Sequence, residues 1–478
     1  MDKHQKLVLF VVVLGSMMAS IDASIILLAF PDMVQSLGAN ISSAIWTIAA
    51  YLLIIAAATT QLGRLGDIYG RAKMFNAGFA VFTVSSALCG AAPSIAFLVF
   101  FRIFQAIGAA LLVANSGAII ADYFERESIG RAYGFLTTGW AVGSFLGIVL
   151  GGVLTTFFGW RYIFYINVPI GIIGFFLGLR YLKDINIVQR KLDIIGMLLL
   201  MGALLSLAFA ALDSAAFGAT AVNEAVAIFG VVLVASFILF ESKVEDPMVD
   251  MRMLAKNHVV MFSMITGMLV SLGYFSVFFM ITLYLQGVRG LDPLNSALLL
   301  LPASIVGGIL GPRMGRMSDK YGARIVATGG ILAYMLAILI FMTITPVSPL
   351  YVIALASTVS GLGVAMFFPA NNSAVMRNTE AKMYGSVNGL LRTMQNTGTL
   401  LSYAISFYVA SLVISRQTAF SIFVGTTQLA GGISAAFVSG VHTALTISFV
   451  ILAAAALMSL ARGRRRTDKE VGRAARQL

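Results

Sequence analysis

"GRLGDIYGRAK", residues 63–73, and "GRMSDKYGAR", residues 315–324, are two copies of one short pattern that start 252 positions apart. The copies share glycine, arginine, aspartate, tyrosine and glycine in register, and each directly follows a long apolar run. A repeat of this kind predicts a chain built from two similar halves, in which the same local structure occurs twice.

The composition predicts a membrane protein. Of the 478 residues, 59% are hydrophobic and 11% are charged, whereas soluble domains carry about 25% charged residues. The apolar residues occur in blocks of about 20, and a helix of that length crosses the roughly 30 Å of bilayer hydrocarbon. We therefore expect an all-α polytopic membrane protein. The single cysteine, Cys89, excludes an internal disulfide.

Fourteen candidate spans follow from this pattern, and the repeated motif comes after the second and after the tenth of them. Two six-helix bundles would then be separated by two inserted helices. The expected domains are an N-terminal bundle at 1–182, the insertion at 183–258, a C-terminal bundle at 259–461 and a basic tail at 462–478. The spans lie at about 7–30, 45–63, 74–92, 95–119, 132–156, 162–182, 194–212, 222–241, 259–286, 294–312, 325–345, 350–374, 385–414 and 441–461.

Lysine and arginine predict the orientation of the chain. With the N-terminus inside, the 32 Lys and Arg fall in cytoplasmic segments, except Arg102 and Arg392 within spans and Arg161, Arg289 and Arg416 on the outer side. Positive charge gathers on the cytoplasmic side of membrane proteins. We therefore expect a multi-pass protein of the cell membrane with both termini in the cytoplasm. The net charge of +12 then requires no nucleic-acid partner.

Several motifs resemble the major facilitator superfamily. The signature of that family between its second and third helices is matched by Gly63, Asp67, Gly70, Arg71 and Lys73. Three further stretches resemble motifs of its drug:proton antiporters: "IDASIILLAFP" at 21–31, "RIFQAIGAA" at 102–110 and "GWAVGSFLGIVLGG" at 139–152. Two others resemble the fourteen-helix branch of these antiporters: "WRYIFYINVPIG" at 160–171 and "YLQGVRGLDPLNSALLLLP" at 284–302.

The resemblance implies a major facilitator fold with two six-helix bundles and two inserted helices. It also implies proton-coupled efflux of lipophilic, drug-like compounds by alternating access, by a protein that functions as a monomer among membrane lipids. The energy source would be the proton gradient, without a cofactor or a metal.

Asp22 is the one acid near the middle of a predicted span. It lies about eight residues from the outer end of its helix, hence roughly 12 Å deep, and Arg102 lies roughly 10 Å deep in the fourth span. The two side chains either pair, or stand apart so that water or substrate reaches the acid. A carboxylate whose surroundings change can bind a proton on one side and release it on the other. We therefore predict that Asp22 and Arg102 couple transport to protons; the alternative is an ion pair that only fixes packing.

The repeated loop predicts a gate. By resemblance, Asp67 would lie against the N-terminal end of the helix that begins near Tyr384. Asp319, with Arg316 beside it, would repeat this arrangement at the helix that begins near Arg131. An aspartate at a helix N-terminus is favoured by the helix dipole. The simpler alternative is that the basic residues only fix the topology.

Glycines recur every four residues in the fifth span, so they share one helical face and allow close approach of a neighbouring helix. The resemblance implies that this face meets the second half and moves during alternating access; the alternative is ordinary small-residue packing. The fifth-helix motif consists of Gly139, Gly143, Gly147, Gly151 and Gly152.

Polar side chains within spans are candidates for a substrate cavity. Asn388, Arg392 and Gln395 are spaced by four and then three residues, so they share one helical face; hydrogen bonding between helices is the alternative for each amide. Acids of the second half often meet cationic drugs in this family, and the spans of the second half contain none. The full set is Tyr51, Gln105, Asn115, Asn388, Arg392 and Gln395.

Efflux of small lipophilic substrates is the predicted function, and a uniporter or symporter of a metabolite or lipid-like solute is the alternative. An enzyme is disfavoured, because His4, His258 and His442 are too far apart in sequence to suggest a metal site and no phosphate-binding GKS or GKT loop occurs. The segment 415–441 is expected on the outer side, either as a hairpin or as an interfacial stretch.

Overall fold

The computed structural model describes residues 1–39, 41–125, 127–185, 187, 193–218, 220–244, 247, 256–411 and 433–462. Most of the predicted outer segment 415–441 and the basic tail after Arg462 therefore lie outside the described residues. Every regular element in the described part is a helix, as the apolar blocks predicted.

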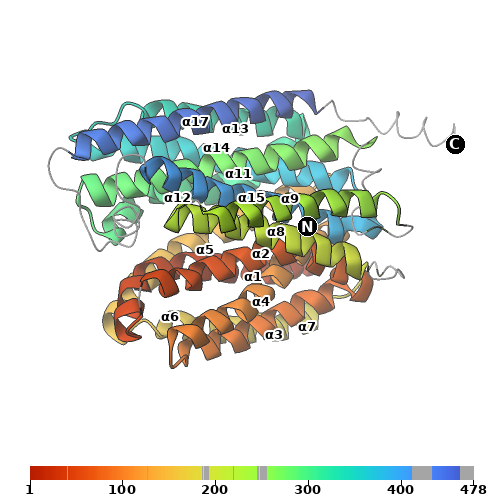
Figure 1. Cartoon of the computed structure of the whole chain (residues 1–478). Helices are drawn as coiled ribbons and strands as arrows, with labels where there is room; N and C mark the ends of the chain where they lie inside the picture. The colour runs from red at the N-terminus through yellow and green to blue at the C-terminus, as the bar shows by residue number, and fades with distance from the viewer. Residues whose placement is uncertain are drawn as a thin grey trace.

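The described helices divide into two bundles and a pair between them, as Figure 1 shows. The first bundle comprises α1 (Lys3–Ser36), α2 (Ile41–Tyr69), α3 (Arg71–Gly90), α4 (Ile95–Tyr123), α5 (Ile129–Phe158), α6 (Tyr162–Tyr165) and α7 (Asn167–Tyr181). The pair comprises α8 (Ile194–Phe217) and α9 (Ala221–Glu241). The second bundle comprises α11 (His258–Leu283), η1 (Tyr284–Val288), α12 (Pro293–Tyr321), α13 (Ala323–Phe341), α14 (Leu350–Arg377), η2 (Ala381–Met383), α15 (Tyr384–Ser411) and α17 (Ile433–Ala461).

Thirteen of the described helical segments are long and apolar enough to cross a membrane. They match thirteen of the predicted spans. The remaining predicted span corresponds to α15, which has 28 residues but is interrupted by polar side chains such as Asn388, Arg392 and Gln395. This helix packs against α2 of the first bundle and α11 of the second, so its polar residues lie between helices.

Contacts repeat between the two bundles. In the first, α1 packs on α5 and α3 on α4; in the second, α11 packs on α15 and α13 on α14. The bundles meet along two seams, one between α2 and α15 and one between α5 and α12. The chain is therefore built from two similar halves, as the repeated motif predicted.

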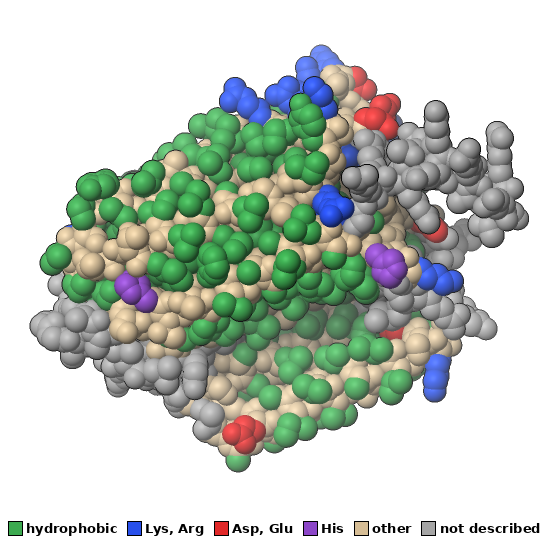
Figure 2. All heavy atoms as spheres, turned by 90° about the horizontal axis from the view of Figure 1, so that it is seen from above, with side chains coloured by type: hydrophobic (Ala, Val, Ile, Leu, Met, Phe, Trp, Pro, Cys, Tyr) green, Lys and Arg blue, Asp and Glu red, His purple; other side chains and the backbone are tan. Residues whose placement is uncertain are grey.

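Apolar side chains cover the outer faces of the bundles, as expected for helices that face lipid. On the face that carries α13 and α17, Figure 2 shows hydrophobic side chains along the helices and most Lys and Arg toward one end. Leu332 and Leu339 of α13, and Val450 and Leu457 of α17, are among the exposed apolar residues.

The inserted pair lies on one of the two seams. Helices α8 and α9 pack on each other, and α8 also contacts α2 and α15. The Trp46 ring of α2 stacks on Phe209 of α8 at 5.6 Å between centroids, and Leu390 of α15 packs against Leu200 and Phe237 of the pair. Both halves are thus bridged on the outside of the α2/α15 seam.

The repeated loops fold alike. Gly70 follows α2 with φ of 106°, and Gly322 follows α12 with φ of 92°. Positive φ is costly for residues that carry a Cβ, so the final glycine of each copy permits the sharp turn into the next helix. The Asp184 carboxylate lies where a side chain on Gly70 would be, and it accepts a hydrogen bond from the Ala72 amide at 2.7 Å.

Candidate functional site

Asp22 lies in the middle of α1 and is fully buried. Its carboxylate pairs with the Arg102 guanidinium of α4 at 2.6 Å between Oδ2 and Nη1. Gln105, one turn further along α4, donates to the other carboxylate oxygen at 2.8 Å, and Asn167 of α7 donates to it at 3.4 Å. The acid is therefore held by three side chains of its own half.

Arg102 has further partners besides Asp22. Its Nε donates to the Thr47 carbonyl of α2 at 3.1 Å, and its guanidinium carbon lies 4.0 Å from the centre of the Tyr51 ring. A buried guanidinium needs both an anion and further partners to offset its desolvation, and here both are present. Of the two arrangements that the sequence left open for Asp22 and Arg102, the structure contains the paired one.

A first latch joins the halves at the end of the bundle that carries the repeated loops, which we call the latch end. Asp67, near the end of α2, accepts hydrogen bonds from the backbone amides of Gly385 and Ser386 at 2.8 and 2.7 Å. The Ser386 hydroxyl donates to the same carboxylate at 2.6 Å. The carboxylate thus caps the start of α15, where unpaired amides and the helix dipole favour a negative charge.

Arg71 supports this first latch. Its Nη2 bonds the Asp67 carboxylate at 2.6 Å, and its Nη1 pairs with Asp122 at the end of α4 at 2.5 Å. It also donates to the carbonyl of Ala381 at 2.7 Å and lies over the Tyr384 ring. One arginine therefore ties together α2, α4 and the segment that leads into α15.

A second latch repeats the first with the halves exchanged. Asp319, near the end of α12, accepts hydrogen bonds from the amides of Gly130 and Arg131 at 3.1 Å each, at the start of α5. It also forms an ion pair with Arg377 at the end of α14. Both aspartate contacts predicted from the repeat are thus present; a gating role remains a prediction.

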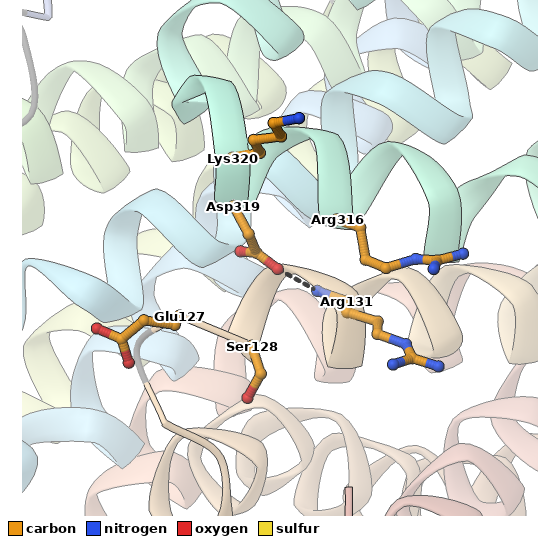
Figure 3. Close-up of a pocket in the computed structure, with 6 residues that line it drawn as sticks. All are labelled: Glu127, Ser128, Arg131, Arg316, Asp319 and Lys320. Atoms are coloured by element: carbon orange, nitrogen blue, oxygen red, sulfur yellow. Dashed lines mark hydrogen bonds between the residues drawn. The ribbon is translucent and has the colours of Figure 1, made fainter.

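The second latch is more open to its surroundings than the first. Figure 3 shows Asp319 against the start of α5, with the guanidinium groups of Arg131 and Arg316 extending together away from it. Arg316 is exposed, as is Lys73 of the first loop, and neither belongs to an ion pair among the described residues. The hollow beside this latch has a volume of about 410 Å³ and is lined by Glu127, Ser128, Arg131, Arg316, Asp319 and Lys320.

Glycines bring the backbones into contact beside both latches. A methyl group placed on Gly63 of α2 would lie 2.3 Å from the carbonyl oxygen of Gly385 in α15. One placed on Gly134 of α5 would lie 2.5 Å from the carbonyl oxygen of Gly311 in α12. Both distances are too short for any side chain. The halves therefore touch through backbone at the latch end of both seams.

The fifth-helix glycines do not meet the second half, and that prediction was wrong. Methyl groups on Gly143 and Gly147 would lie 2.5 and 2.7 Å from the carbonyl oxygens of Met17 and Ile21 in α1. Gly139 and Gly151 face α1 in the same way. The periodicity correctly placed the glycines on one face, but the face of α5 that meets α12 is the neighbouring one.

The predicted cavity residues fall into separate groups. Tyr51 and Gln105 belong to the surroundings of Asp22. Asn115 donates to the carbonyl of Leu111 in its own helix at 2.9 Å and to the carbonyl of Leu62 in α2 at 3.5 Å. Asn388 donates across the α4/α15 contact to the carbonyl of Ala114 at 2.6 Å. These two amides therefore make helix contacts, the alternative that the sequence left open. Arg392 and Gln395 form a third group.

Four polar residues of these clusters escaped the sequence analysis. Asp122 and Arg377 stand at the ends of α4 and α14, which occupy equivalent places in the two halves, so the repeat could have pointed to them. Asp184 comes after the bundle, and Asn167 lies within the apolar start of α7. Neither has a signal in the sequence. Among the described residues, no group of three or more His, Cys, Asp or Glu could hold a metal ion.

Comparison with known proteins identifies the family. The family model described as Major Facilitator Superfamily matches residues 12–403. The riboflavin transporter RibZ of Clostridioides difficile is 30% identical over 419 residues, which cover 87% of this chain and 91% of RibZ. The multidrug resistance protein Stp of Mycobacterium tuberculosis is 30% identical over 408 residues, which cover 85% of this chain and 76% of Stp.

The structure is also similar to that of a solved transporter. The solved structure of the proton:xylose symporter XylE superposes with a TM-score of 0.64 at 13% identity, covering 95% of this chain and 94% of XylE. At that identity the likeness concerns the fold alone, and it agrees with the two-bundle arrangement described above. The chain belongs to the Major Facilitator Superfamily and is a transporter, not an enzyme.

Proposed function

We propose that the protein is a proton-coupled antiporter that exports lipophilic, drug-like compounds by alternating access. The observation that carries this proposal is the Asp22–Arg102 pair, a titratable acid buried within a membrane helix and held only by residues of the N-terminal half. Intramembrane acids are costly and are typical of proton relays and substrate pathways. The identity to a multidrug resistance protein supports export as the direction.

Protonation of Asp22 would weaken the contacts that fix α1. A neutral carboxyl group loses the charge-assisted bond to Arg102, and the buried guanidinium is then left without its anion, which is strongly unfavourable. The pair joins α1 to α4, so a change in the charge of Asp22 favours a different position of α1.

Movement of α1 has a direct route to a latch. The backbone of α1 beside Asp22 contacts α5, because Gly147 approaches the Ile21 carbonyl and the Ser24 side chain. The start of the same α5 donates the two amides that Asp319 accepts. We propose that proton binding at Asp22 acts through the α1/α5 contact on the second latch, and that the two latches open together when the cavity turns to the other side.

The topology and domain arrangement that we propose rest on the sequence. We propose fourteen membrane helices, with α15 as the span that is more polar than the others. The domains are two six-helix bundles and an inserted pair, both termini face the cytoplasm, and the monomer is the functional unit. In this orientation the latch end is the cytoplasmic end, and the closed latches correspond to a state that does not open to the cytoplasm.

The test is proton movement in liposomes. The purified protein is reconstituted with an internal pH dye, a proton gradient is imposed, and lipophilic cations, anions and neutral compounds are added in turn. We expect substrate-triggered proton flux in the wild type and none in Asp22→Asn. Asp32→Asn is the matched control, because Asp32 is an exposed acid on the same helix. Equal proton flux in wild type and Asp22→Asn would contradict the assignment of Asp22.

A metabolite carrier is the second candidate, because RibZ, which matches nearly its whole length, is a riboflavin transporter. Uptake of radiolabelled riboflavin into liposomes with and without an imposed proton gradient distinguishes a metabolite carrier from a drug antiporter. Transport of riboflavin that is indifferent to the proton gradient would favour a uniporter on the same fold.

A further inference from the structure

Arg392 is a cation within α15 that forms no ion pair with any residue in the described part of the chain. It lies eight residues after the start of the helix at Tyr384, hence about 12 Å from the latch end. Its one side-chain partner is the neutral Gln395, whose oxygen lies 3.4 Å from Nη1. The Nε group is buried and has no acceptor.

Two further hydrogen-bond donors without partners accompany Arg392. Asn396 stands one turn further along α15, and its Nδ2 is buried without an acceptor. The hydroxyl of Tyr133, from α5 of the other half, is also buried without a partner among the described residues. It meets the same point at Gly117 of α4 as the side chain of Asn388, which stands one turn before Arg392 on α15. The group formed by Arg392, Asn396 and Tyr133, which we call the donor cluster, thus offers donors from both halves.

The second half of the sequence supplies no acid for this cluster. Between residues 259 and 461 the acids are Asp292, Asp319 and Glu380. Asp292 precedes α12, Asp319 belongs to the second latch, and Glu380 precedes α15. A guanidinium held in a membrane protein without an anion is costly, and buried donors normally have acceptors. The described residues therefore leave the cluster without an anionic acceptor, and a bound ligand would complete it by supplying one.

We propose that the donor cluster binds the negatively charged or acceptor-rich part of the transported compound, so that the protein prefers anionic cargo, such as an organic carboxylate or sulfonate, over cationic cargo. This inference rests on the proposed transport function and specifies its substrate class. The cluster is placed for this role, because Tyr133 on α5 and Arg392 on α15 belong to opposite halves of the protein. Arg392 is partly exposed, whereas Arg102 is fully buried.

The experiment uses three dyes that share a xanthene ring system: a fluorescein anion, a rhodamine cation and a neutral ester. Transport of each dye is measured in proteoliposomes, and binding of each dye to the purified protein in detergent is measured by fluorescence anisotropy. The variants are Arg392→Gln, which removes the charge, and Arg392→Lys, which keeps it. Arg180→Gln is the matched control, because Arg180 is exposed at the end of α7.

We expect the wild type to bind and transport the anion at least tenfold better than the cation. Arg392→Gln should lower this anion-to-cation ratio at least tenfold, whereas Arg392→Lys retains most of it and Arg180→Gln leaves it unchanged. Size-exclusion profiles that match the wild type show that the variants are folded. A ratio that does not change in Arg392→Gln, or a wild type that prefers the cation, overturns the proposal.

Two further outcomes would distinguish this proposal from a site for small inorganic anions and from the proposed antiport function. If millimolar chloride, exchanged against gluconate, abolishes anion binding, the cluster is a site for small inorganic anions and the substrate proposal is wrong. If the dyes bind with a preference that depends on Arg392 but none is moved by a proton gradient, the binding site stands and the proposed antiport function fails.

Discussion

Arg102 of the N-terminal half and Arg392 of the C-terminal half differ in their electrostatic partners. In the N-terminal half, Arg102 is buried against Asp22, Gln105 and a backbone carbonyl, so that its charge is neutralised within the protein. In the C-terminal half, Arg392 has one long hydrogen bond to a neutral amide. The same architecture therefore contains one closed electrostatic unit and one open unit. In the closed unit, Asp22 can bind or release a proton while the compensating charge of Arg102 stays within the protein. In the open unit, Arg392 can bind an anion that a ligand supplies.

The latches show the same contrast. The Asp67 side chain is fully buried and accepts bonds from Gly385, Ser386 and Arg71. The Asp319 side chain is 10% exposed and has two longer amide bonds and Arg377. One repeated sequence thus produces a tighter latch at the α2/α15 seam than at the α5/α12 seam.

The largest expected effect is on the free energy of unfolding, and it tests the contrast between Arg102 and Arg392. Arg102→Gln leaves the Asp22 charge buried without its cation, and we expect a loss of about 3–5 kcal/mol in the free energy of unfolding. Arg392→Gln should change the free energy of unfolding by less than about 1 kcal/mol, since it loses only one long hydrogen bond to the neutral Gln395. Thermal unfolding in detergent measures both. The double variant Asp22→Asn/Arg102→Gln should recover most of the loss, and failure to do so would mean that the pair is not the coupled unit described here.

The second prediction sharpens the contrast between the latches. Thr393 is buried in α15, where its hydroxyl accepts a hydrogen bond from Thr60 of α2 at 2.7 Å. A Thr393→Cys variant should react slowly with a maleimide reagent, and Cys89 is buried and contributes little. We expect Asp67→Ala to raise the labelling rate about tenfold and Asp319→Ala to raise it less. The opposite order would show that the α5/α12 seam controls opening.

A third prediction concerns the α1/α5 contact. Gly143→Ala places a methyl group against the Met17 carbonyl, a close approach that must shift α1, and we expect a loss of about 1–3 kcal/mol. It should also slow proton-coupled transport. Gly202→Ala in α8 is the control, because a methyl group there would meet only the end of the Leu233 side chain at 3.2 Å. Equal effects in both variants would exclude a special role for α1/α5.

The smallest effect is expected at the arginine that ends the C-terminal bundle. Arg462 bonds the Asn371 side chain at 3.1 Å and the Ala323 carbonyl at 2.6 Å, both neutral. Burial, with the nearby charge of Arg324, lowers the pKa of Arg462 to about 10. A folded-state pKa below the unfolded value means that this charge opposes folding at neutral pH and does so less as the pH rises through 10.

Arg462→Gln should therefore change the unfolding midpoint by no more than a few degrees at pH 7.5. Arg71→Gln should lower it clearly, because two carboxylates, Asp67 and Asp122, lose their cation. Thermal unfolding of both variants at pH 7.5 and pH 10 tests this, and a large loss of stability in Arg462→Gln would be inconsistent with neutral partners.

The sequence predicted the parts of the site that depend on repetition and depth. The two loops shared Asp67 and Asp319 in register, so two latches could be expected, and similar depths in two spans made a pair between Asp22 and Arg102 one of two possible arrangements. It could not predict which helix the α5 glycines face, because a period of four residues defines a face and not its partner. Nor could it predict Asn167 as a partner of Asp22, since that contact depends on how α7 packs.

The lone charge of Arg392 also bears on how the membrane voltage drives transport. If the cargo is an anion, its exit from a cell whose interior is negative moves charge in the favourable direction, adding about 2.3 kcal/mol per charge per 100 mV. A cation leaving by the same route would oppose the voltage by the same amount. For any fixed number of protons, exchange of an anion is therefore more electrogenic than exchange of a cation by two charges. An inside-negative potassium potential set with valinomycin should therefore accelerate export of the anionic dye more than export of the cationic one.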